Sequence, residues 1–174
     1  DIFFGASVTV TRDNLAEVTD ESFVKELSAR GCRILFYVEY VPVDGVSLKA
    51  LSSADRMLLA GRIDELRARK DPILFISFPG DEDALGGCLA AGRGFFHISA
   101  RGSAEACPFS PYSDVNLVNV PLSAALDSPL FAALRDRGFL ESTHEGGCAL
   151  FAHDSETRVL EAQLREGTCN RADT

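Results

Sequence analysis

The chain has 174 residues, enough to bury a hydrophobic core as one domain or two small ones. Its 26 acidic and 17 basic residues give a net charge of −9, and no lysine or arginine cluster interrupts this excess, so we expect no nucleic-acid partner. No apolar run is long enough to span a bilayer and no signal peptide is recognisable, which predicts a cytoplasmic protein without a membrane partner. Five cysteines, an odd number, argue against a disulfide framework.

The first 80 residues alternate between strand and helix patterns. Apolar and small polar residues alternate in the first strand, and the later strands are apolar on both faces, as in a buried parallel sheet. The first helix is predicted to begin at the N-cap Thr19 and to stop at Gly31. The predicted strands are 2–11, 33–41 and 73–78, and the second helix runs from Ser52 or Ser53 to about Lys70. The chain opens inside an apolar run, which we interpret as the start of a fragment.

The pattern changes after residue 80. A β-hairpin is expected from strands 95–99 and 103–108, turned at Arg101-Gly102, and an irregular stretch follows over 110–120. One helix is predicted over 123–137 despite Pro129, another over 155–165, and a frayed tail over 166–174. The predicted fold is therefore α/β: an incomplete parallel (β/α) barrel portion over 1–80, then a small α+β module over 81–174.

Cys88, Cys107 and Cys148 are the candidate metal ligands. Thirteen residues separate Cys88 from Gly102 and four separate Gly102 from Cys107, which fits two thiolates brought together across the hairpin. Soft thiolates favour an iron–sulfur cluster or zinc, although the paired cysteine knuckles typical of zinc are absent. Three buried structural thiols are the alternative. A fourth ligand would come from Cys169, His144 or His153, whereas Cys32 heads a buried strand and is interpreted as core.

The Cys-x₁₃-Gly-x₄-Cys spacing resembles the opening of the SPASM/Twitch auxiliary-cluster domain of radical S-adenosylmethionine (radical SAM) enzymes. Further segments look similar to parts of the same enzymes. The segments 5–14 and 40–45 resemble late barrel strands, and the segment 87–93 resembles a Gly-Cys-Ile-Ala-x-Gly-Arg motif of one subgroup. The resemblance extends over nearly the whole chain, but the Cys-x₃-Cys-x₂-Cys loop that binds the SAM-cleaving cluster is not in the sequence. The chain therefore resembles the C-terminal half of such an enzyme.

The resemblance implies a parent enzyme that makes a 5′-deoxyadenosyl radical and abstracts hydrogen from a small-molecule or peptide substrate. It implies an auxiliary [4Fe-4S] cluster on Cys88, Cys107 and Cys148. S-adenosylmethionine would bind only in the complete enzyme, with the missing N-terminal barrel half as partner, so this chain alone should not cleave it. A non-catalytic zinc or iron–sulfur module that serves structure or interaction is the alternative function, and a plain α/β domain with empty thiols is a third.

Two groups in the first 80 residues are candidates for the rest of a site. The candidate cofactor-binding residues lie along the first strand and the loop at its C-terminal end: Ser7, Thr9, Arg12 and Asn14. Side chains at this end of the strands bind cofactor or substrate in parallel barrels. Ordinary strand alternation followed by a capping loop explains the same residues equally well. Glu39 is the single acid in an apolar strand and is the candidate catalytic residue. A buried carboxylate must otherwise be paired or protonated, unless its face is open to solvent. Arg93 is interpreted as a contact to cluster or substrate, or as a surface arginine.

Overall fold

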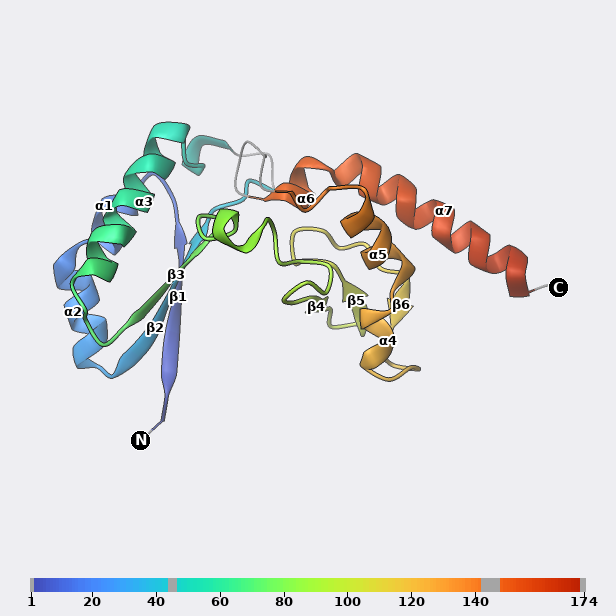
Figure 1. The fold of residues 1–174 in the computed structure, drawn as a ribbon, viewed down its shortest axis with the longest axis horizontal. Coiled ribbons are helices and arrows are strands. Elements are labelled where there is room, and N and C mark those ends of the chain that lie inside the picture. The colour runs from blue at the N-terminus through green and yellow to red at the C-terminus, as the bar shows by residue number, and fades with distance from the viewer. Residues whose placement is uncertain (1, 44–46, 142–147, 173–174) are drawn as a thin grey trace. The chain divides into compact units, whose positions relative to one another are not determined.

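The computed structural model describes residues 2–43, 47–141 and 148–172, and the chain divides into two compact units, Asp1–Asp83 and Ala84–Thr174 (Figure 1). The first unit contains a parallel sheet in the order β1-β2-β3, formed by Phe4–Val10, Cys32–Glu39 and Leu74–Phe78. Parallel neighbours need a crossover between them, and helices provide it here. The predicted β-α-β-α-β series is confirmed, and the chain is of mixed α/β class.

The helices of the first unit all lie on one side of this sheet (Figure 1). They are α1 (Leu15–Val18), α2 (Glu21–Ala29) and α3 (Ser53–Ala68), with a 3₁₀ turn η1 at Ser47–Lys49. As predicted, α3 turns Leu59, Ile63 and Leu66 into the core. Tyr37 of β2 is fully buried beneath the helices, and its hydroxyl donates to the carbonyl of Val18 at 2.9 Å.

The predicted start of the first helix is wrong, because a short helix, α1, comes before it and its N-cap is Asp20 rather than Thr19. Residues Leu15–Val18 already form a helical turn, and the Thr19 hydroxyl donates back to the carbonyl of Leu15 at 2.8 Å instead of capping the next helix. Asp20 is the N-cap of α2, because its carboxylate accepts from the amide of Ser22 at 2.8 Å. Both residue types suit an N-cap, so local propensity could not choose between neighbours.

The start of α3 and the end of α2 agree with the sequence. Ser52 caps α3, and its side chain and the Asp55 carboxylate satisfy each other's amides in a capping box. Gly31 follows α2 with a φ of +93°, the left-handed conformation that glycine adopts without strain.

Gly61 lies in the middle of α3, where a methyl group would meet no atom within 4 Å. Replacing it with alanine is expected to raise the free energy of unfolding by about 0.5–1 kcal/mol, because alanine loses less backbone entropy in a helix. Gly5→Ala is the matched contrast: a Cβ at Gly5 would lie 2.9 Å from the carbonyl oxygen of Ile34, so this variant should unfold at a lower urea concentration. Equal midpoints in urea for the two variants would contradict the prediction.

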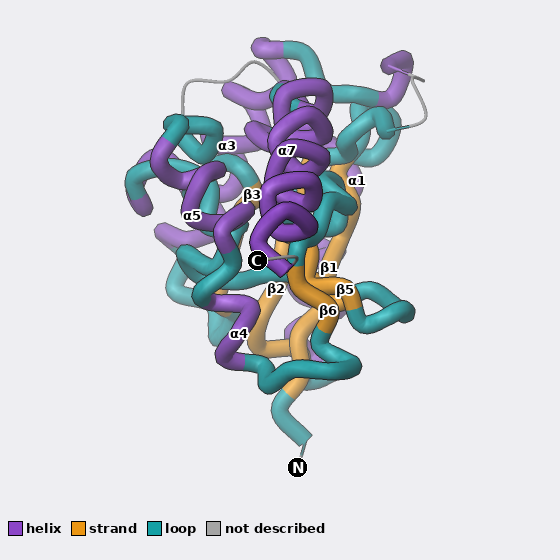
Figure 2. The backbone as a smooth tube through the Cα atoms, turned by 90° about the vertical axis from the view of Figure 1, so that its right-hand side faces the viewer, coloured by secondary structure: helices purple, strands orange, loops and turns teal. Residues whose placement is uncertain are grey.

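The second unit combines an antiparallel sheet with helices. The sheet has the order β4-β5-β6, from His97–Ile98, Ser103–Glu105 and Val115–Asn116, and Figure 2 shows β5 and β6 side by side. The helices are α4 (Ser123–Leu126), α5 (Pro129–Asp136), α6 (Ala149–Ala152) and α7 (Asp154–Ala172), with a 3₁₀ turn η2 at Asp83–Leu85. Among the described residues, no helix is both long and apolar enough to cross a membrane.

The hairpin predicted around Arg101-Gly102 is confirmed, and the glycine takes a φ of +80° in the turn. The stretch 110–120, predicted to be irregular, supplies the third strand, β6. The strand β6 has two residues, and an alternation of apolar and polar residues cannot be recognised over so short a segment.

Two helix predictions in the second unit are wrong. The helix expected over 123–137 is two helices, because Pro129 has no amide to donate within a helix. Proline instead occupies the first turn of α5, where Ser128 is the N-cap and accepts from the amide of Phe131 at 3.0 Å. The last helix does not end at 165: its backbone remains helical to Ala172, through a segment without proline.

Candidate metal centre

The structure brings Cys88, Cys107 and Cys148 together in the second unit. Cys88 and Cys107 are each 5 % exposed and belong to the hydrophobic core of this unit, and the half-buried Cys148 packs against that core. The pKa of the Cys107 thiol is raised by its hydrogen bond with Cys148, by burial, and by the nearby charges that Cys148 and Cys88 would carry. Cys107 is therefore close to two other cysteines, each from a separate segment of the second unit.

Cys88 is held by backbone contacts that depend on the glycine before it. The amide of Cys88 donates to the carbonyl of Leu140 at 2.7 Å, and the Arg93 guanidinium donates to the carbonyl of Cys88 at 2.9 Å. Gly87 has a φ of +106°, and a Cβ there would lie 2.2 Å from the oxygen of Leu140. A side chain at position 87 is excluded by both conformation and space.

Cys107 lies just after β5, in a short turn. The amide of Ser110 donates to the carbonyl of Cys107 at 2.9 Å, and the two residues form an isolated antiparallel bridge. The amide of Phe109 donates to the sulfur of Cys107, which opposes the rise in the thiol pKa because it stabilises a thiolate. An amide directed at a cysteine sulfur is one of the interactions by which proteins tune iron–sulfur clusters.

Cys148 precedes α6 with an extended backbone, and its carbonyl accepts from the amide of Ala152 at 3.3 Å. The predicted fourth ligands add no described donor at this point of the structure. His144 and the side chain of Cys169 lie outside the described residues. The ring of His153 stacks on Phe139 with centroids 4.4 Å apart, and its Nδ1 is 3.6 Å from a carboxylate oxygen of Glu156.

A metal-binding role for the three cysteines stays a prediction. Among the residues that the structure describes, no group of three or more histidine, cysteine, aspartate or glutamate side chains is already arranged around a metal position. Thiols must lose their protons to become ligands, so Cys107 and Cys148, which are hydrogen-bonded to each other, would have to rearrange locally to bind a metal. The chemistry of three clustered sulfurs fits a soft metal, iron or zinc.

Cys32, the remaining described cysteine, belongs to the first unit. It is fully buried and its thiol donates to the carbonyl of Ile34 at 3.1 Å, in agreement with the predicted core role. His97 of β4 has Nδ1 2.9 Å from a carboxylate oxygen of Glu105 on the neighbouring strand β5. Both residues have a structural partner.

Ser7, Thr9, Arg12 and Asn14 lie along the end of β1 and the following turn. Ser7 and Thr9 are exposed on the sheet face opposite the helices. Arg12 is 3.3 Å from a carboxylate oxygen of Asp55. The Asn14 side chain accepts from the amide of Thr11 at 2.8 Å and donates to the carbonyl of Thr9 at 3.0 Å. The loop is thus held by local bonds, and a cofactor-binding role for these four residues stays a prediction.

Glu39 is the best explained of the predicted site residues. It is 3 % exposed, and Nε of Arg56 donates to both of its carboxylate oxygens, at 2.8 and 3.0 Å. The arginine comes from the first turns of α3, so the ion pair ties that helix to the end of β2. Of the alternatives left by the sequence, the carboxylate is paired and its face is not open to solvent. The ion pair accounts for a buried acid without catalysis, and the catalytic role stays a prediction.

The Gly87→Ala variant tests how Cys88 is positioned. A left-handed alanine costs roughly 1–2 kcal/mol, and the overlap with the Leu140 carbonyl adds to it, so we expect a loss of at least about 2 kcal/mol of unfolding free energy. Amide hydrogen exchange at Cys88 should also become faster, because its bond to Leu140 is the contact that the methyl group displaces. Unchanged protection at Cys88 would contradict this account of the loop.

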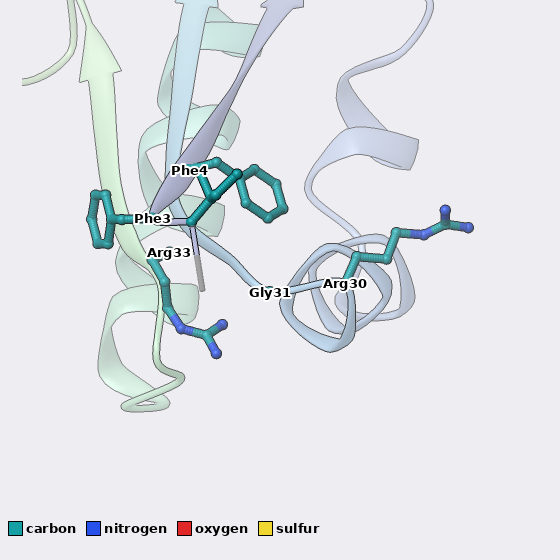
Figure 3. A pocket seen from close by; sticks show the side chains of 6 residues that line it. Phe3, Phe4, Arg30, Gly31 and Arg33 are labelled. Atoms are coloured by element: carbon teal, nitrogen blue, oxygen red, sulfur yellow. The ribbon is translucent and has the colours of Figure 1, made fainter.

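Cavities outside the cysteine cluster were not foreseen from the sequence. One in the first unit, of about 540 Å³, is lined by the start of β1 and by Arg30 and Arg33, whose side chains extend in different directions (Figure 3). One in the second unit, of about 240 Å³, is lined by Arg93 and Arg135. Arg135 lies on the predicted helix 123–137 without any local signal that distinguishes it from its neighbours.

Comparisons of the chain with protein-family models, with curated proteins and with solved structures found no match.

Proposed function

We propose that Cys88, Cys107 and Cys148 hold an auxiliary iron–sulfur cluster in a radical SAM-type enzyme. The observation that supports this most is that Cys107 is hydrogen-bonded to Cys148 and lies close enough to Cys88 to feel its charge, beside one hydrophobic core. The radical SAM resemblance of the sequence adds the cluster type, [4Fe-4S], and the auxiliary role. In this proposal the parallel sheet of Asp1–Asp83 is the late part of a (β/α) barrel, and Ala84–Thr174 is the cluster-binding module.

The residues of this chain would prepare the site rather than perform the chemistry. When bound, the cluster would supply electron transfer or a point of attachment for substrate. Burial of Cys88 and Cys107 keeps water away from the sulfurs, and the Phe109 amide stabilises a thiolate at Cys107. In the complete enzyme, Ser7, Thr9, Arg12 and Asn14 would contact S-adenosylmethionine or substrate, and Glu39 would act on substrate if Arg56 releases it.

Anaerobic reconstitution of the 174-residue protein with iron and sulfide tests the proposal directly. We expect a brown protein that contains about four iron and four sulfide per chain, as a [4Fe-4S] cluster requires. Zinc is offered to a second sample. A colourless protein that binds one zinc and no cluster would overturn the iron–sulfur proposal in favour of a non-catalytic zinc module. A folded protein that binds neither metal anaerobically would overturn the metal centre altogether.

A further inference from the structure

The 240 Å³ cavity of the second unit combines two arginines with one acid. It is lined by Gly86, Arg93, Arg135, Gly138, Leu140 and Glu141. Arg93 comes from the loop after Cys88 and Arg135 from the last turn of α5, so two separate segments each contribute a guanidinium. The glycines and the leucine complete the wall of the cavity.

Both guanidinium groups are held in place by backbone carbonyls. Arg93 donates from Nη1 to Cys88 at 2.9 Å and from Nη2 to Leu85 at 3.1 Å, and Arg135 donates from Nη1 to Ala91 at 2.6 Å. A guanidinium has five donors in a rigid fork, so each arginine keeps further donors for a ligand. The carbonyl bonds reduce the side-chain entropy that binding would otherwise cost.

The positive charges of this pair are not neutralised within the described structure. Neither Arg93 nor Arg135 forms an ion pair with any residue whose side chain is described. The chain as a whole carries a net charge of −9, so two arginines on one cavity that lack an acidic partner among the described residues form a local positive site. Such a site favours an anionic ligand. Carboxylates and phosphates are the groups that the guanidinium fork matches.

Glu141 restricts which anion fits. Its carboxylate lies over Gly138, where a Cβ would be 2.8 Å from Oε1, and Gly138 has a φ of +74°. A negative charge on the same cavity repels a dianion more than a monoanion and attracts a cationic group. One carboxylate and one ammonium group on the same ligand would match the two kinds of charge that line the cavity.

Two further cavities, both lined by described residues of the first unit, lack this combination. In the 540 Å³ cavity, Arg30 is paired with Glu26 at 2.7 Å, and Arg33 extends in a different direction (Figure 3). In a 310 Å³ cavity beside α2 and α3, Arg69 pairs with Glu21 and Arg62 with Glu65. In these two cavities the arginines either have an acidic partner already or do not point toward one another.

We propose that the 240 Å³ cavity binds a free α-amino acid. Its carboxylate lies between Arg93 and Arg135, and its ammonium group faces Glu141. The volume is below the roughly 300–1,000 Å³ of drug-sized pockets, which suits a ligand of amino-acid size. The proposal does not depend on the cysteines or on bound metal.

Isothermal titration calorimetry on the metal-free 174-residue protein tests it, with the twenty L-amino acids, acetate, methylammonium and phosphate as probes. We expect saturable binding of at least one amino acid, and at least tenfold weaker binding of the other three probes. Absence of binding by all twenty amino acids would overturn the proposal. Phosphate that binds as tightly as the best amino acid would also overturn it, because the site would then recognise any anion.

Arg135→Gln is expected to weaken amino-acid binding at least tenfold, and Arg137→Gln, on the exposed residue that ends α5 outside the cavity, should leave it unchanged. Because Arg135 also supports the Ala91 carbonyl, Glu141→Gln provides a test independent of folding. Because Glu141 is exposed, this substitution should leave the fold intact, and it should weaken the binding of the amino acid and strengthen the binding of acetate. If the ratio of the two affinities stays the same in Glu141→Gln, Glu141 does not face an ammonium group and the proposal fails.

Discussion

Replacing Cys107 by serine is expected to reduce the iron bound after anaerobic reconstitution from about four per chain to nearly none. A serine hydroxyl is a hard ligand of similar size, so it removes the soft thiolate while leaving the packing of the buried cluster almost unchanged. Cys88→Ser and Cys148→Ser should have the same effect, since the proposed cluster needs all three thiolates as ligands. Iron and sulfide are quantified, and the visible absorbance of each variant is recorded.

The control for this series is Cys32→Ala. Cys32 is fully buried but belongs to the first unit, where its thiol donates to the carbonyl of Ile34, so the iron content of this variant should equal that of the unmodified protein. Circular dichroism separates loss of ligand from loss of fold in each variant. Iron retained by all three serine variants would show that the cysteine cluster is structural.

Replacing Arg56 by methionine is expected to lower the free energy of unfolding by about 3 kcal/mol, because it leaves the Glu39 carboxylate buried without its partner. The estimate is at the lower end for a buried pair, since the Arg56 side chain is 30 % exposed and water can reach the site. Urea unfolding measures the change. If a change within about 0.5 kcal/mol were found, Glu39 would be solvated or protonated, and a functional role for it would gain weight.

Two variants provide the controls for Arg56→Met. Arg30→Met removes one partner of an exposed i,i+4 pair with Glu26 and should change stability by less than about 1 kcal/mol. The double variant Glu39→Met/Arg56→Met removes both charges and should recover most of the lost stability, because the uncompensated carboxylate is then gone. A double variant as unstable as the single one would mean that the loss comes from packing of the arginine stem.

The strands of the first unit and the helix α3 could be predicted because local patterns specify them. Alternation in β1 and the spacing of Leu59, Ile63 and Leu66 each reflect one buried face, and the Ser52 cap is a local signal. Thr19, Pro129 and the residues after 165 were assigned wrongly because each allows more than one helix boundary. The strand β6 was missed because two residues in a sheet depend on their neighbour β5 and not on their own pattern.

The sequence by itself determined the three strands and the helix α3 of the first unit, the hairpin of the second, and the presence of thiols beside glycine and proline. Only the tertiary structure decided which side chains meet. Cys148 reaches Cys107, Arg56 reaches Glu39, and Arg135 shares a cavity with Arg93. Each of these pairs joins residues from different elements, and such long-range contacts follow from how the elements pack, which local periodicity and spacing do not encode.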